Sequence, residues 1–222
     1  MRAVFFDVGE TLVSEDRIWR QWAEWYGVPV LTFFGVLGAV IERRGHHLDV
    51  FAAFDPDFDL DRVQAERREA GVAYDIGTDD LYPDAVPCLQ ALKAAGYLVG
   101  VAGNQPPEVS ERLFGASGVE LDVVASSSGW AVEKPDPAFF ARLAAEARLA
   151  PAEIAYVGDR VDNDVLPARA AGMTAVFLRR GPWGYVHAGW PEAAQADLRI
   201  DSLAELPDAL AAAPHRPTTD AG

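Results

Sequence analysis

The sequence of 222 residues predicts an α/β fold, a doubly wound parallel sheet that carries an inserted helical subdomain. Short apolar runs, each long enough for one buried strand, recur along the chain. From residue 83 onward these runs alternate with single helical patterns, which is typical of a parallel sheet with helices on its faces. Between the first run and residue 83 no second strand is predicted, which indicates an insertion.

The first predicted strand is Ala3–Phe6, an apolar run that ends in Asp7. Later runs of the same kind are Tyr97–Ala102, Asp122–Ala125, Ile154–Gly158, Thr174–Leu178 and Asp197–Ile200. Helices are predicted between them at Pro87–Ala95, Pro106–Phe114, Asp136–Ala147 and Asp162–Ala171. A glycine follows three of these helices, as is common where a helix ends in a left-handed residue.

Residues 14–82 form the predicted helical insert, or cap, and residues 1–13 and 83–213 form the core. The insert carries aromatic residues at helical spacing, namely Trp19, Trp22, Trp25 and Tyr26. We expect them to form the core of the insert, the alternative being an aromatic pocket. The uncharged stretch Trp25–Ile41 contains glycine and proline, so we interpret it as buried helix rather than a membrane span. Residues 214–222 lack apolar periodicity and are expected to be a frayed tail.

The composition excludes some classes of partner. Nineteen Lys and Arg against 34 Asp and Glu give a formal charge of −15, which argues against nucleic acid and anionic membranes as partners. The single cysteine, Cys88, cannot form an intramolecular disulfide and is expected on a helix in the core. The first residues contain too short an apolar run for a signal peptide, so a cytoplasmic location is expected. The sequence does not indicate an oligomeric state.

Polar residues at the ends of predicted strands carry the chemistry. Asp7 and Asp159 each follow a buried run, and in open α/β sheets ligands bind at the carboxyl ends of the strands. Two carboxylates that converge there would repel each other unless a hard cation bridged them, and Mg²⁺ is the natural candidate. Lys134 is one of only two lysines in the chain, and it would add a compact positive charge.

These segments resemble the motifs of the haloacid dehalogenase superfamily, in the branch with a helical cap after the first strand. The four motifs appear in order as Asp7-Val8-Gly9-Glu10-Thr11, Gly103-Asn104, Lys134-Pro135, and Gly158-Asp159 with Asp164. The resemblance covers nearly the whole chain, because the order of the motifs, the position of the cap and the pattern of strands all agree.

The resemblance implies a role for each matching residue. Asp7 would be the covalent nucleophile and Lys134 its catalytic partner. Mg²⁺ would be held by Asp7, the backbone carbonyl of Gly9 and Asp159. The substrate, expected to be a small phosphorylated metabolite, would be bound by Gly103, Asn104 and Lys134. Asp164 and Thr11 are expected to support these groups rather than to bind metal or substrate themselves.

Two positions depart from the family's phosphatase pattern. Gly9 stands where those enzymes have an aspartate that acts as general acid and base, a function worth about 10²–10⁴-fold in rate. A glycine can still offer its carbonyl to Mg²⁺, so the change removes proton transfer and leaves metal binding. Glu10 is the neighbouring candidate for a replacement acid. Gly103 stands where a serine or threonine hydroxyl would bind the phosphoryl group.

Three interpretations follow from these departures. The first is a Mg²⁺-dependent phosphohydrolase that takes its proton from a good leaving group or from His46, His47 or Glu15 in the cap. The second is a metal-independent, dehalogenase-like hydrolase. The third is a scaffold with weakened chemistry and a role in binding or assembly. Trp183 and Trp190 lie in an irregular stretch, which is expected to pack beside the site or to cover the sheet edge.

Overall fold

In the computed structural model the chain divides into two compact units, Met1–Ser14 with Gly77–Gly222, and Glu15–Ile76. The structure describes residues 1–72, 76–105 and 107–213. The predicted tail, 214–222, lies outside the described residues, as does Pro106, the predicted start of a helix. Residues 77–82 were assigned to the insert from sequence but belong to the first unit. There Val13 pairs with Leu81, and the Ser14 N–H donates to the Asp80 carbonyl at 2.8 Å.

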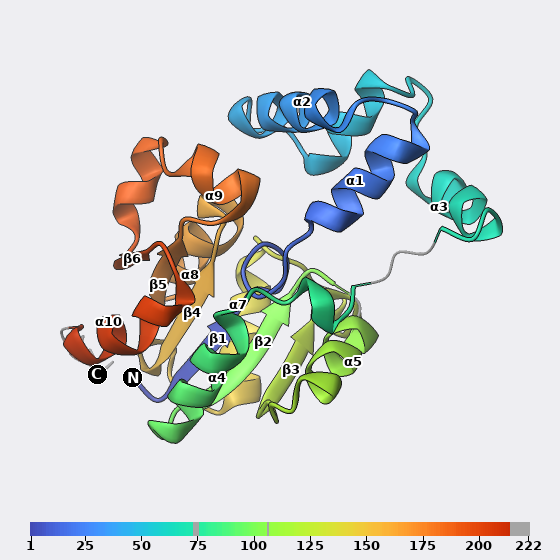
Figure 1. The fold of residues 1–222 in the computed structure, drawn as a ribbon. Coiled ribbons are helices and arrows are strands. Elements are labelled where there is room, and N and C mark those ends of the chain that lie inside the picture. Colours follow the sequence, from blue (N-terminus) through green and yellow to red (C-terminus); the bar gives the residue numbers. More distant parts are fainter. Residues whose placement is uncertain (73–75, 106, 214–222) are drawn as a thin grey trace. The chain divides into compact units, whose positions relative to one another are not determined.

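The first unit is built on a six-stranded sheet of order β3-β2-β1-β4-β5-β6 (Figure 1). Every neighbouring pair is parallel, which confirms the predicted fold class. The strands are β1 (Ala3–Phe6), β2 (Leu98–Gly103), β3 (Val123–Ser126), β4 (Ile154–Gly158), β5 (Thr174–Leu178) and β6 (Leu198–Ile200).

Three strands begin one residue later than predicted, and for β3 and β6 the preceding aspartate explains why. The Asp122 carboxylate accepts from the Val99 N–H at 2.8 Å, and that of Asp197 accepts from the Ala175 N–H at 2.9 Å. Each aspartate therefore satisfies the backbone of the neighbouring strand with its side chain instead of opening its own strand. The third strand that begins late is β2, which starts at Leu98.

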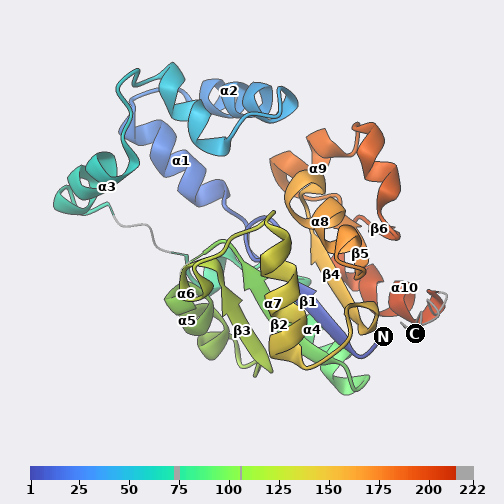
Figure 2. The ribbon, with the colours of Figure 1, turned by 180° about the vertical axis from the view of Figure 1, so that it is seen from behind.

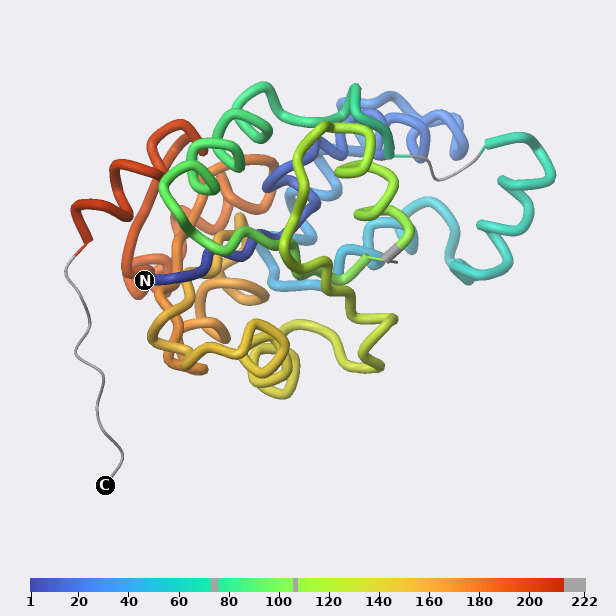
Figure 3. Tube along the Cα trace, turned by 90° about the horizontal axis from the view of Figure 1, so that it is seen from below, coloured from blue at the N-terminus to red at the C-terminus, as the bar shows by residue number. Residues whose placement is uncertain are grey.

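Helices cover both faces of the sheet (Figures 1, 2 and 3). One face carries α4 (Ala85–Ala94) and α5 (Pro107–Ser117), and the other carries α7 (Pro137–Ala147) and α8 (Leu166–Ala170). Residues of α7 pack on the sheet through aromatic contacts, such as Phe140 against Tyr156 at 5.2 Å between ring centroids. The remaining helices of this unit are α6 (Ser127–Trp130), α9 (Gly181–His187) and α10 (Leu206–Ala212), together with a π-helical turn at Val161–Val165 and short 3₁₀ turns.

The topology places the predicted site residues at one edge. The chain moves outward from β1 to β2 and β3, then crosses to β4 and moves outward the other way, so the order reverses between β1 and β4. Phe6 is level with Val101 of β2 and Val157 of β4. Because all the strands point the same way, the residues that follow them meet at the carboxyl edge, where doubly wound sheets bind ligands.

The second unit is helical, with α1 (Asp16–Trp25), α2 (Val30–Glu42), a 3₁₀ helix at His47–Ala53 and α3 (Leu60–Glu69). Trp19 and Trp22 are buried in an aromatic core, in which Trp22 and Phe51 lie 4.4 Å apart between ring centroids. The guanidinium of Arg67, also buried, covers the Trp22 ring at 3.7 Å. Trp25 and Tyr26 are half-buried.

Among the described residues, no single helix has both the length and the apolar composition that a membrane crossing requires. The α1–α2 pair meets the length and composition test only when its two helices are taken together across a 111° bend.

Candidate active site

Asp7 lies at the mouth of the sheet, immediately after β1. Its backbone N–H donates to the Val157 carbonyl of β4 at 2.9 Å, which extends the strand pairing by one residue and fixes the side chain at the edge. The side chain is 12% exposed, so it is open to a ligand while most of its surface is enclosed. This is the position and access that a nucleophile needs.

The turn after Asp7 reverses the chain tightly. The N–H groups of Leu12 and Val13 both donate to the Val8 carbonyl, at 2.9 and 3.0 Å. Glu10 adopts a left-handed conformation, with φ at 52°. Its carboxylate accepts from the Tyr82 hydroxyl at 2.6 Å, and burial together with this carboxylate raises the pKa of Tyr82. Glu10 is therefore engaged with Tyr82, which weakens its case as a replacement general acid.

Lys134 joins two of the carboxylates. Its Nζ lies 2.8 Å from Asp7 Oδ1 and 2.6 Å from Asp164 Oδ1, and its side chain is fully buried. Burial alone would lower the pKa of Lys134, but the charges of Asp164 and Asp7 outweigh it and the pKa is raised well above its usual value. Lys134 is therefore a permanent cation that holds the carboxylates of Asp7 and Asp164 in place.

Asn104 fixes the backbone that carries the lysine. Its side-chain oxygen accepts from the Lys134 N–H and its amide nitrogen donates to the Lys134 carbonyl, both at 2.9 Å. The sequence predicts Asn104 as a substrate-binding residue, but here its amide bonds to the loop that holds the lysine. This contact links the end of β2 to the Lys134 loop.

Asp164 packs closely under the end of β4. Its Oδ2 accepts from the Arg160 N–H at 3.0 Å, and a Cβ added to Gly158 would overlap this carboxylate. Glycine at position 158 is therefore what allows Asp164 to approach Lys134. Burial raises the pKa of Asp164 to about 6, with Lys134 acting in the opposite direction and Asp7 adding to the rise.

Asp159 is the least satisfied of the three acids. The Thr11 hydroxyl lies 3.5 Å from its Oδ1, at the limit of a hydrogen bond, and its buried Oδ2 has no partner among the described residues. Burial, followed by the charges of Asp164 and Asp7, raises the pKa of Asp159 well above its usual value. An orphaned, buried carboxylate oxygen beside two other acids is a costly arrangement for the protein alone.

The three carboxylates fit a divalent cation. Asp7, Asp159 and Asp164 each offer an oxygen, and these oxygens lie within 4.8 Å of one another. Lys134 supplies one positive charge against the three acids, so a cation would relieve the remaining repulsion and give Asp159 Oδ2 a partner. Hard oxygen ligands of this kind suit Mg²⁺. The structure brings Asp164 into this group, although we expected it only in a supporting role.

The β2 side of the mouth is formed by Gly103 and Gln105 instead of acidic side chains. Gly103 ends β2 and is buried, and a Cβ added to it would lie 2.7 Å from Asp7 Oδ1 and overlap the side-chain oxygen of Gln105. Sequence reasoning missed Gln105. The signal was the glycine two residues earlier, which leaves space beside Asp7 for another side chain to fill.

The remaining candidates lie elsewhere. In the Glu15–Ile76 unit, Nδ1 of His46 accepts from the Leu48 N–H at 3.3 Å, and the His46 ring packs on His47 at 4.2 Å between centroids. Glu15 opens the same unit.

Trp183 and Trp190 are buried beside the loop that follows β4. The Arg160 guanidinium lies 5.6 Å from the Trp183 ring. Trp190 stacks on His187 at 3.8 Å, and His187 accepts from the Val161 N–H. Of the two alternatives for these tryptophans, packing beside the site agrees with the structure, because both lie next to the loop that follows β4.

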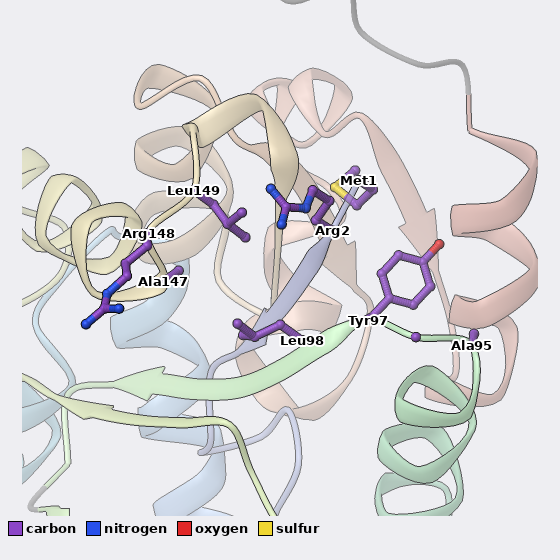
Figure 4. Close-up of a pocket in the computed structure, with 9 residues that line it drawn as sticks. Met1, Arg2, Ala95, Tyr97, Leu98, Ala147, Arg148 and Leu149 are labelled. Atoms are coloured by element: carbon purple, nitrogen blue, oxygen red, sulfur yellow. The ribbon is translucent and has the colours of Figure 1, made fainter.

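A cavity of about 500 Å³ opens at the other end of the sheet (Figure 4). Its lining includes Met1, Arg2 and Leu98, which precede or begin β1 and β2, so it lies at the amino ends of these strands. It is therefore separate from the cluster of acids at the carboxyl edge.

Residues 1–172 match the family model of haloacid dehalogenase-like hydrolases, which is more than half of the chain, and the protein belongs to this family. It is 37% identical over 105 residues to the glyceraldehyde 3-phosphate phosphatase of Methanopyrus kandleri, a match that covers 46% of this chain and 45% of that protein. The chain spans about half the length of the curated relatives it matches.

Solved structures share the fold. A predicted phosphoglycolate phosphatase from Haemophilus somnus 129Pt is similar with a TM-score of 0.70 and 23% identity, over 94% of this chain and 97% of that one. An L-2-haloacid dehalogenase from Xanthobacter autotrophicus is similar with a TM-score of 0.67 and 18% identity, over 96% and 100%. Since both phosphatases and dehalogenases have this fold, the fold alone does not select between the two reactions.

Proposed function

We propose that this protein is a Mg²⁺-dependent phosphohydrolase that acts on a small phosphorylated metabolite through a covalent intermediate at Asp7. The observation that carries the proposal is the group of three buried or nearly buried carboxylates around Lys134, with an orphaned oxygen on Asp159. A dehalogenase-like reaction needs the nucleophile and the lysine but has no use for a divalent cation. The relatives named as phosphatases support the same choice.

Each residue would have a defined task. A carboxylate oxygen of Asp7 attacks phosphorus and the bond to the leaving oxygen breaks, which gives an aspartyl phosphate; water then attacks phosphorus and releases inorganic phosphate and free Asp7. Lys134 holds Asp7 in place and stabilises negative charge beside it. Mg²⁺, held by Asp7, Asp159 and the Gly9 carbonyl with Asp164 next to them, would neutralise charge on the phosphoryl oxygens.

The missing general acid limits the substrate. Position 9 is a glycine, and the neighbouring Glu10 is bonded to Tyr82, so neither of them offers a proton to the leaving oxygen. We therefore expect substrates whose leaving group departs without protonation, such as acyl phosphates or esters of acidic alcohols. With a series of aryl phosphates, kcat/KM should rise steeply as the pKa of the leaving phenol falls. An equal rate on phenyl phosphate and 2,4-dinitrophenyl phosphate would show that a general acid is present after all.

A substrate screen tests the reaction class. Phosphate esters, acyl phosphates and haloacids should be assayed with Mg²⁺ and with EDTA, on the wild type and on Asp7→Asn. Phosphate release that requires Mg²⁺ and is abolished in Asp7→Asn is the expected result. Halide release that is insensitive to EDTA would replace our proposal with the dehalogenase alternative. A folded protein with no turnover on any class would support the scaffold alternative.

A further inference from the structure

The side chain of Gln105 occupies the space beside the nucleophile. A Cβ built on Gly103 would overlap Gln105 Oε1 and would lie 2.7 Å from Asp7 Oδ1. The end of the Gln105 amide and the Asp7 carboxylate therefore both lie too close to this position to leave room for a carbon atom. In the phosphatase pattern, this is the direction in which a serine or threonine at position 103 would project.

A buried hydroxyl holds this amide in place. Gln105 Nε2 lies 2.8 Å from Ser110 Oγ, and Ser110, on α5, is fully buried. Gln105 itself is half-buried, so its tip is anchored on one side and open toward Asp7 on the other. An anchored amide loses little further entropy when it binds a ligand.

The amide can present either of its ends to Asp7. A serine hydroxyl both donates and accepts, so Ser110 can bond to Nε2 or, with the amide turned by 180°, to Oε1. With Oε1 toward Asp7, two electron-rich oxygens face each other. In the turned orientation an N–H of Gln105 faces the carboxylate, and faces any phosphoryl group bound there.

Two other side-chain donors at the mouth are already engaged. Lys134 bonds to Asp7 and Asp164, and Asn104 bonds to the backbone of Lys134. Gly103 has no side chain. A phosphoryl oxygen directed toward β2 would therefore meet the Gln105 amide.

We propose that Gln105 is a phosphoryl-binding residue, whose Nε2 donates to a substrate phosphoryl oxygen in place of the hydroxyl that Gly103 lacks. This inference rests on the proposed phosphohydrolase function and names a residue of the same site. Ser110 is the positioning residue that holds the amide.

Gln105→Glu is the sharpest test, because the glutamate has the same length and can still accept from Ser110 but has no N–H and carries a negative charge. We expect kcat/KM for p-nitrophenyl phosphate with Mg²⁺ to fall by at least about 100-fold, and the affinity for orthovanadate, measured by calorimetry, to fall in parallel. Gln105→Ala should lose about 10- to 100-fold, the range for one hydrogen bond to a charged group. Ser110→Ala should lose only a few-fold, and nothing further in the Gln105→Ala background.

Gln90→Glu is the matched control, since it makes the same chemical change at an exposed position on α4 and should leave both readouts unchanged. Thermal unfolding will show whether each variant folds, and Gln105→Met replaces Gln105→Glu if that variant does not. Wild-type turnover and vanadate affinity in the Gln105 variants would overturn this inference and leave the proposed function standing. A wild type that neither hydrolyses the ester nor binds orthovanadate would overturn both.

Discussion

The two sides of the site differ in the interactions that hold their side chains in place. The acidic side, formed by Asp7, Asp159, Asp164 and Lys134, is a cluster of buried charges at the ends of β1 and β4. The amide side, formed by Gly103, Asn104 and Gln105 at the end of β2, is neutral and is organised by hydrogen bonds. Both occupy the same carboxyl edge of one parallel sheet.

This difference shows how the site divides its work. Under the proposed function, the excess negative charge on the acidic side would make that side depend on a cation and would couple its stability to its chemistry. The amide side carries no net charge; Asn104 holds the Lys134 loop, and in our proposal Gln105 binds a phosphoryl oxygen. Substitutions on the acidic side should therefore have large effects that respond to Mg²⁺, and those on the amide side should have small effects that do not.

Replacing Lys134 with methionine should have the largest effect on stability. It leaves the carboxylates of Asp7 and Asp164 buried without their partner, and breaking a buried ion pair in this way costs about 3–5 kcal/mol. We expect urea unfolding to show this loss in EDTA, with part of it recovered in Mg²⁺, and no phosphate release.

The other lysine of the chain is the control for this experiment. Lys93 bonds to the Glu120 carbonyl and to Asp122, and its side chain is 31% exposed, so Lys93→Met should cost about 1 kcal/mol or less. If the two variants lose equal stability, the acidic side is not a strained charge cluster.

Asp159→Asn should separate stability from function. The substitution removes a buried charge whose Oδ2 has no partner among the described residues, and whose pKa is raised by burial and by the neighbouring acids. Without metal, the free energy of unfolding should rise by roughly 1–3 kcal/mol, because a neutral amide costs less to bury than an unsatisfied charge and no longer repels Asp164 and Asp7. The variant should lose both its activity and the stabilisation by Mg²⁺ that the wild type shows in thermal unfolding.

Asp162→Asn is the control, and it tests whether the effect is specific to position 159. Asp162 is three residues from Asp159 and already pairs with Arg160 through two hydrogen bonds. It should keep the response to Mg²⁺ and gain no stability. A wild type that is equally stable in Mg²⁺ and in EDTA would argue against a metal site at this edge.

Three of the four groups on the acidic side were predictable from sequence because each follows a readable signal, whereas Asp164 was expected only in a supporting role. Asp7 and Asp159 follow buried strands, and the parallel pairing of β1 with β4 brings them together. Lys134 was conspicuous because lysine is rare in this chain. The family motifs then implied a role for each of these three residues.

The amide side was less predictable because its geometry depends on the missing side chain at Gly103. The Gln105 side chain can lie beside Asp7 only because Gly103 has no side chain, and it is held there by Ser110, five residues further along the chain on α5. No local pattern reports such a combination. Likewise, sequence placed Glu10 near the site but gave no sign that Tyr82, 72 residues away, would bind its carboxylate.

Gly103→Ala tests the amide side by adding one carbon atom. The new Cβ would displace Gln105 or Asp7, and we expect kcat/KM to fall by about tenfold, because small misplacements of reacting groups are costly. Gly115→Ala is the control, since a Cβ on this residue of α5 meets nothing within 4 Å and should stabilise the helix by about 0.5–1 kcal/mol with unchanged activity. A Gly103→Ala enzyme with the kcat/KM of the wild type would mean that the space beside Asp7 is not used.

Asn104→Ala should have the smallest effect, and it decides between two roles for this residue. If Asn104 positions the Lys134 loop through its two hydrogen bonds, the variant loses about 1 kcal/mol of stability while its affinity for orthovanadate changes by less than about threefold. If Asn104 binds the substrate, as the motif implies, vanadate affinity falls and the stability is unchanged.

Asn104→Asp separates the two roles further. The aspartate can still accept from the Lys134 N–H but cannot donate to the Lys134 carbonyl, so as a positioning residue it should lose at least as much stability as the alanine variant. A loss of stability in both variants without a loss of vanadate affinity would make Asn104 the link between the two sides, a neutral side chain of the amide side that holds the one cation of the acidic cluster.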